Sequence, residues 1–124
     1  MIKKLFNKKC IIEIDFKTLS EMVECSLKFV DKDKYIVKRK VFVCSNYKDL
    51  ISKIAGWEDV TIVDCDQISL ELIMEWILQI KRQYKIKFIA IDSFRYTLLA
   101  SELKKIGFDK YKRKNLKCIN YRKS

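Results

Sequence analysis

The chain has 124 residues and a formal net charge of +11, and it contains no His, no Pro and only 2 Gly. Without His there is no Ser-His-Asp or Cys-His catalysis and no zinc site built on His ligands. The two glycines, Gly56 and Gly107, stand alone, so no Gly-rich phosphate-binding loop can be formed. Among hydrolytic mechanisms, a metal ion held by oxygen ligands is the one that this composition favours.

The positive charge is concentrated at the two ends of the chain. Residues 1–10 carry a net charge of +4 and residues 104–124 carry +8, whereas residues 11–103 sum to −1. Basic ends of this kind can neutralise the phosphates of a nucleic acid. Because 22 of the 27 basic residues are Lys, AT-rich coding would produce the same excess, and the charge alone does not separate the two explanations.

The length suits one domain with a substantial core, since 49% of the residues are hydrophobic. We expect a single, partial domain over residues 1–124, with basic ends at 1–10 and 110–124 that need not be ordered. No apolar run reaches the roughly 20 residues that span a bilayer, and the N-terminus lacks the apolar core of a secretory signal. Five scattered cysteines without a CxxC motif indicate reduced, buried thiols in a cytoplasmic protein without a membrane partner: Cys10, Cys25, Cys44, Cys65 and Cys118.

The first half of the chain has the residue pattern of β-strands. Cys10–Asp15 is a β-rich run that ends on a carboxylate, and Cys25–Val30 alternates between apolar and other side chains. A polar turn then leads into Tyr35–Cys44, which is rich in β-branched and aromatic residues. These runs predict a three-stranded antiparallel meander. Asn46 is placed to cap a short helix that extends to Ile54.

The second half alternates between short strands and helices. Ser69 can cap a helix whose apolar residues, including Trp76, recur at spacings of three and four and predict a core-facing stripe. A second helix is predicted from Phe94 to Ile106, with Gly107 just beyond its last turn. The extended pieces are Val60–Val63, Lys87–Ile91 and Leu116–Ile119. An antiparallel meander joined to parallel strands with flanking helices predicts an α/β fold with a ribonuclease H-like layout.

Two aspartates stand at the ends of predicted strands, Asp15 after the first strand and Asp92 after the apolar strand that precedes the last helix. If these strands are parallel neighbours, both carboxylates can reach one divalent cation, and oxygen ligands favour Mg²⁺ or Mn²⁺. Glu13 shares a strand face with Asp15 and could add a ligand. The alternative is structural: Asp92 would be a helix cap or turn residue, and Asp15 a solvated strand end.

Other charged residues have weaker patterns. Asp64 and Asp66 lie in a polar turn and are interpreted as loop acids. Arg95, close to Asp92, could contact a phosphate or steady the acid, or could be a surface residue of the helix. The basic run Lys112, Arg113 and Lys114 is a candidate DNA contact.

Several segments together resemble the nuclease domain of the large subunit of tailed-phage terminases. Ile86–Asp109 is similar to a segment of that domain in which a strand is followed by an Asp, an aromatic residue with an Arg, and a helix. The segment ends with a Gly-Phe pair, as it does in the family. Val60–Ile77 is similar to the segment that precedes it in the family, which contains a turn, an acid, an Ile and then a helix with a Trp-Ile pair. Glu13–Phe29 looks like the first catalytic strand and its return, and Tyr35–Cys44 like the third strand. The resemblance covers about residues 10 to 118.

The resemblance implies a ribonuclease H-like endonuclease that cuts double-stranded phage DNA during packaging and uses Mg²⁺ or Mn²⁺. Asp15 falls on the family's first-strand aspartate, and Asp92 on its central-strand acid. Glu21 falls where relatives often carry another acid.

The chain also departs from the terminase pattern. The packaging ATPase domain is absent, and so is the family's last catalytic aspartate, because Asp109 is the only acid after Glu102. We therefore expect an incomplete nuclease module, with a separately encoded terminase ATPase or small subunit as a possible partner in the bacterial host cell. Two alternatives remain: a catalytically inactive prophage remnant, or an interaction subunit, either of which binds DNA non-specifically at most.

Overall fold

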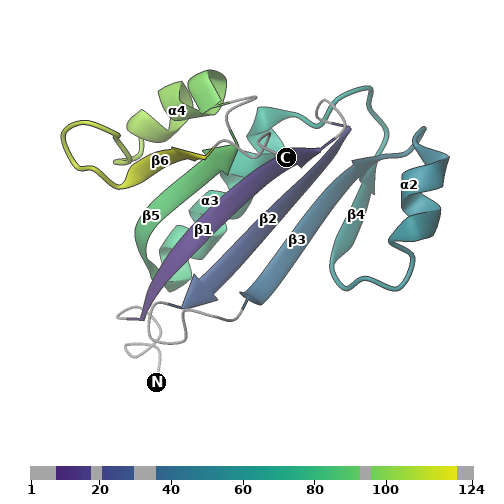
Figure 1. The fold of residues 1–124 in the computed structure, drawn as a ribbon, viewed down its shortest axis with the longest axis horizontal. Helices are drawn as coiled ribbons and strands as arrows, with labels where there is room; N and C mark the ends of the chain where they lie inside the picture. Colours follow the sequence, from purple (N-terminus) through teal and green to yellow (C-terminus); the bar gives the residue numbers. More distant parts are fainter. Residues whose placement is uncertain (1–7, 18–20, 30–35, 93–95, 120–124) are drawn as a thin grey trace.

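The computed structural model describes residues 8–17, 21–29, 36–92 and 96–119. These residues form one sheet with helices beside it (Figure 1). The elements, in chain order, are β1 (Lys9–Lys17), β2 (Met22–Phe29), β3 (Ile36–Cys44), α2 (Lys48–Lys53), β4 (Val60–Val63), α3 (Leu70–Gln83), β5 (Lys85–Asp92), α4 (Tyr96–Lys104) and β6 (Leu116–Ile119). The predicted succession of strands and helices is therefore confirmed.

The sheet that these residues form has six strands in the order β4-β3-β2-β1-β5-β6. Strands β1, β2 and β3 pair antiparallel, which confirms the meander. Strand β5 pairs parallel with β1, and β6 pairs parallel with β5, as the alternation of strands and helices predicts. Strand β4 instead joins the far edge, where it runs parallel to β3.

Strand alternation separates the two faces of the sheet. In β1 the side chains of Cys10, Ile12, Ile14 and Phe16 are buried, whereas those between them are only partly covered. The buried set belongs to the main core, to which α3 contributes Ile73, Trp76, Ile77 and Ile80, and α4 contributes Leu99 and Leu103. Helices α3 and α4 therefore cover one face of the sheet, and the other face of β1 lies away from them.

Helix α3 forms where its N-cap and its apolar stripe agree. The Ser69 hydroxyl accepts a hydrogen bond from the backbone N–H of Glu71 at 3.0 Å, which confirms the predicted cap. Trp76 is 7% exposed and lies in the main core, as its helical spacing predicts. Burial of each large aliphatic side chain on this stripe contributes roughly 1.5 to 3 kcal/mol.

A smaller core lies on the opposite face, under α2. It comprises Met22, Val41, Val43 and Ile54, with Leu50, Ile51 and Val60 packed against it. The predicted cap of α2 is wrong: the N-cap residue is Tyr47, and no side chain caps the helix. Hydrogen bonds from Ser45 N–H to the Val63 carbonyl and from Tyr47 N–H to the Cys44 carbonyl shape this turn and shift the helix start beyond Asn46.

Helix α4 ends on a Schellman motif centred on Gly107. The N–H of Phe108 donates to the Leu103 carbonyl at 3.0 Å, and the N–H of Gly107 donates to the Lys104 carbonyl at 3.2 Å. Gly107 has φ +102°, a conformation that side-chain-bearing residues rarely adopt. The predicted glycine stop is confirmed; the predicted first residues of the helix, Phe94 and Arg95, lie outside the described residues.

In the part of the chain that the structure describes, none of the helices combines the length and the apolar character needed to cross a bilayer.

The Gly107→Ala variant tests this helix stop. A side chain at φ +102° is strained although the space beside it is open, so the free energy of unfolding should fall by about 1 to 2 kcal/mol, measured by urea denaturation. Gly56→Ala is the matched control, because Gly56 also has open space but no such φ, and its stability should change by less than about 0.5 kcal/mol. Equal effects of the two substitutions would contradict this explanation of the helix end.

Candidate functional site

Asp15 and Asp92 lie side by side near the carboxyl ends of two neighbouring parallel strands. Asp92 is the last residue of β5, whereas β1 continues to Lys17, so the predicted end of the first strand at Asp15 is wrong. The pairing of β1 with β5 runs through Ile12↔Ile89 to Ile14↔Ile91, and each aspartate is the next residue of its strand. Because Ile14 and Ile91 both enter the main core, the aspartates that follow them both belong to the opposite face. Adjacent strands are about 4.8 Å apart, so the two carboxylates can converge on one ligand.

Glu24 extends this pair into a row of three acids. In the antiparallel pairing of β1 with β2, Glu24 is the direct partner of Asp15. The row Glu24, Asp15 and Asp92, here called the acidic row, lies on one face of the sheet. It crosses β2, β1 and β5, which are neighbouring strands (Figure 1). The sequence pattern does not single out Glu24, because the register of a hairpin has to be known before its partner can be assigned.

Lys17 places an ammonium group against the acidic row. Its Nζ lies 2.9 Å from Oδ2 of Asp15, and both side chains stand on the same face of β1. The hydrogen bond to Asp15 raises the pKa of Lys17, and the charges of Asp15, Glu24 and Asp92 raise it further, against the opposing effect of partial burial. The negative charge of the row is thus partly balanced from within the fold. Lys17 was not singled out by the sequence pattern either.

The members of the acidic row differ in burial and in their cationic neighbours. Asp92 is 7% exposed, whereas the side chains of Asp15 and Glu24 are 29% and 17% exposed. Glu24 pairs with Arg39, whose Nε lies 2.9 Å from its Oε2, and the Arg39 guanidinium lies over the Trp57 ring at 5.5 Å from the ring centroid. Of the two aspartates, Asp15 is the more accessible, because more of its side chain is exposed than of Asp92.

Glu13 occupies the same face of β1, two residues before Asp15. Its register partner on β5 is Ala90, so it lies beside the row and not in it, at about 7 Å along the strand. The ammonium of Lys28 lies 3.5 Å from its carboxylate. Its predicted role as a metal ligand stays a prediction.

The remaining candidate residues lie in several places. Glu21 precedes β2, and its carbonyl accepts a hydrogen bond from the N–H of Cys44 at 2.9 Å. Asp64 and Asp66 are exposed after β4, where loop acids were predicted. Arg95 lies outside the described residues. Lys112, Arg113 and Lys114 are exposed in the turn that precedes β6.

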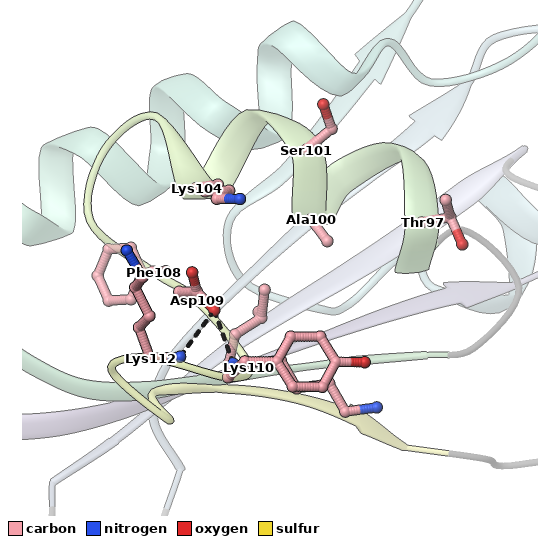
Figure 2. A pocket seen from close by; sticks show the side chains of 10 residues that line it. Thr97, Ala100, Ser101, Lys104, Phe108, Asp109, Lys110 and Lys112 are labelled. Carbon is pink, nitrogen blue, oxygen red and sulfur yellow. Dashed lines mark hydrogen bonds between the residues drawn. The ribbon is translucent and has the colours of Figure 1, made fainter.

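This basic turn is held by the Asp109 side chain. Its Oδ1 accepts hydrogen bonds from the N–H groups of Tyr111 at 2.6 Å and Lys112 at 3.2 Å, drawn in Figure 2 as dashed lines. These two bonds lower the pKa of Asp109. The turn forms one wall of an open groove of about 390 Å³ whose other wall is α4, with Lys104 beside it. Asp109 thus shapes the turn and is not part of the acidic row.

Within the acidic row, the donor set of Asp15 and Asp92 fits a hard divalent cation. It offers carboxylate oxygens, which Mg²⁺ and Mn²⁺ prefer, on rigid neighbouring strands. Across the described ranges, no three or more His, Cys, Asp or Glu residues are close enough together to form a metal-binding group. Two carboxylates with water as the remaining ligand are a usual arrangement for Mg²⁺.

The strand order and the helix positions define a ribonuclease H-like fold, in which β4 lies beside β3. The structure is similar to the crystal structure of the HK97 bacteriophage large terminase, with a TM-score of 0.66 and 10% sequence identity. The match covers 94% of this chain and 26% of that terminase chain. At this identity the similarity establishes the fold alone. The resemblance seen in the sequence is therefore confirmed for the fold.

No protein-family model matches the chain, and no curated protein sequence matches it.

A double-mutant cycle on Asp15 and Lys17 measures how strongly the two charges are coupled. Asp15→Asn, Lys17→Met and the double variant should give a coupling free energy of about 0.5 to 1 kcal/mol in urea denaturation at low salt. The matched control is the exposed pair Lys105 and Glu102, whose atoms lie 3.3 Å apart and which should couple by less than about 0.3 kcal/mol. A coupling no larger than that of the control would show that Lys17 does not balance the acidic row.

Proposed function

We propose that the chain is a terminase-like nuclease module that hydrolyses phosphodiester bonds of double-stranded DNA with Mg²⁺ or Mn²⁺ held by Asp15 and Asp92. The observation that carries this proposal is the parallel register that ends with Ile14 opposite Ile91. It sets two carboxylates next to each other near the carboxyl ends of the strands, the side on which open α/β sheets bind their ligands. The similarity in fold to the HK97 large terminase supports the same class of function.

Asp15 and Asp92 share one task in this proposal, and Lys17 has another. A divalent ion at this position would polarise a phosphoryl oxygen of the DNA and activate a water molecule for attack. Asp15 and Asp92 would hold such an ion in a fixed position, because both stand on paired strands. The side chain of Lys17 is 42% exposed and has a flexible stem, so it would leave Asp15 if that carboxylate bound a cation, and would then face Glu24 or a DNA phosphate.

Lys117, on the same face as the acidic row, and the basic turn before its strand provide a path for the DNA backbone. Lys117 of β6 is the register partner of Ala90, two residues before Asp92, and its Nζ lies 4.0 Å from the centroid of the Phe88 ring. The exposed Lys112, Arg113 and Lys114 precede the same strand. A duplex that reaches the acidic row along β6 would meet these charges in succession.

A second candidate function is non-specific DNA binding without catalysis. The observation that favours it is the pairing already present in the fold, since Lys17 binds Asp15 and Arg39 binds Glu24. A row that is balanced by its own cations is stable without a metal ion, as expected for an inactive remnant that retains its basic surface.

The nuclease proposal predicts nicking and linearisation of supercoiled plasmid by the purified chain in Mn²⁺. Asp15→Asn and Asp92→Asn should each lower the rate by about 100-fold or more, because each removes a charged ligand. Both variants should also weaken Mn²⁺ binding in calorimetric titration, which separates loss of the ion from other defects.

Glu102→Gln is the matched control, because Glu102 is a half-exposed helical acid away from the row. It should leave cleavage and Mn²⁺ binding unchanged. Absence of cleavage by the folded chain, or cleavage undiminished in Asp92→Asn, would overturn the nuclease proposal and leave DNA binding as the remaining candidate.

Replacement of Lys112, Arg113 and Lys114 by Ala tests the basic turn in either case. The slope of log affinity against log salt for a DNA duplex should become shallower by about 2 to 3, since each phosphate contact contributes about 0.9. Fluorescence anisotropy between 50 and 200 mM salt measures it. A matched triple variant of Lys38, Lys48 and Lys53, which are also exposed, should change the slope by less than about 1. Equal changes in the two triple variants would contradict a DNA contact at this turn.

A further inference from the structure

Two cysteines that are far apart in the sequence meet at one edge of the sheet. Cys44 is the last residue of β3, and Cys65 follows the end of β4 by two residues. Their Sγ atoms lie 3.1 Å apart. Cys44 is fully buried, whereas Cys65 is partly exposed.

The backbone on both sides of this pair is already fixed. Cys44 is the register partner of Val63 in the parallel pairing of β3 with β4, and the N–H of Ser45 donates to the Val63 carbonyl at 2.8 Å. The N–H of Cys44 donates to the Glu21 carbonyl, which holds β3 from its other side. A bond of about 2.05 Å between the sulfurs requires an approach of only about 1 Å.

We propose that Cys44 and Cys65 are a redox-active pair that forms a reversible disulfide by exchange with a small disulfide such as oxidised glutathione. The Cys65 thiolate attacks one sulfur of the glutathione disulfide, breaks its S–S bond and releases one glutathione thiolate, which takes up a proton. Cys44 then attacks the Cys65 sulfur of the mixed disulfide, and the second glutathione leaves as a thiolate that takes up the proton lost by Cys44. Two protein thiols are oxidised, and one glutathione disulfide is reduced to two thiols.

The environment of the pair sets the order of these steps. Burial, and next the contact with Cys65, raise the pKa of Cys44 to about 12, so Cys44 is a poor first nucleophile. Cys65 is the thiol that a small disulfide can reach, and Cys44 waits beside it as the resolving thiol. Burial also raises the pKa of Cys10 to about 12 and that of Cys25 still higher, so these two thiols are protected from exchange.

The disulfide would tie the end of β3 to the loop after β4. The closed segment, residues 45–64, contains α2 and the edge strand β4, which is only four residues long. Within the described sheet, β4 pairs with β3 alone. A covalent link here would stabilise the weakest edge of the sheet, because it removes conformational freedom from the unfolded chain.

The full chain carrying Cys118→Ser tests the proposal, since Cys118 is exposed on β6 and could otherwise link two chains. After incubation with oxidised glutathione, intact mass should fall by two hydrogens, and peptide mapping should find Cys44 joined to Cys65. The melting temperature should rise by roughly 5 to 10 °C and return on reduction with dithiothreitol.

Cys65→Ser in the same background should gain no disulfide and show no rise in melting temperature. Cys25→Ser should still form the Cys44–Cys65 bond, which separates a specific pair from general thiol oxidation. An intact mass that stays at the dithiol value, or that stops at a glutathione adduct on Cys65, would overturn the proposal.

Discussion

The parallel pairing of β1 with β5 is the constraint on which the rest of the structure depends. It joins the N-terminal meander to the C-terminal strand-helix units in one sheet. Its register determines which residues of β1 and β5 lie directly beside each other. With Ile14 opposite Ile91, the apolar residues of both strands enter the core under α3 and α4, and Asp15 and Asp92 come together on the other face. A shift of one residue would reverse both faces of a strand, so the same contacts that stabilise the core hold the two carboxylates in place.

The charges around this register are nearly balanced by the fold itself. Lys17, Lys28 and Arg39 each bind one acid of the β1–β2 hairpin. Such half-exposed pairs contribute little stability individually, but they offset the repulsion between acids on neighbouring strands. In the nuclease proposal, a cation must compete with Lys17 for Asp15, and this competition distinguishes an active module from a balanced remnant. The exposed basic turn lies apart from these acids, because it precedes β6, whereas Asp15 and Asp92 lie near the carboxyl ends of β1 and β5.

The elements could be predicted from the sequence because each depends on local information. Ser69, the apolar stripe through Trp76, and Gly107 specify their helix boundaries through nearby backbone groups. The pairing of Asp15 with Asp92 could be expected from two strand ends in one predicted sheet. Glu24, Lys17 and the contact of Cys44 with Cys65 could not, because they depend on hairpin register and on the position of β4 beside β3. The absence of a CxxC motif likewise indicated scattered thiols, whereas the sheet brings two of them together.

The most direct test of the central claim is the position of a bound divalent ion. Crystals of the chain grown or soaked in Mn²⁺ should give an anomalous difference peak between the carboxylates of Asp15 and Asp92, with Lys17 Nζ moved away from Asp15. A peak at some other place on the molecule, or none near the acidic row with Lys17 still 2.9 Å from Asp15 at saturating Mn²⁺, would contradict the account.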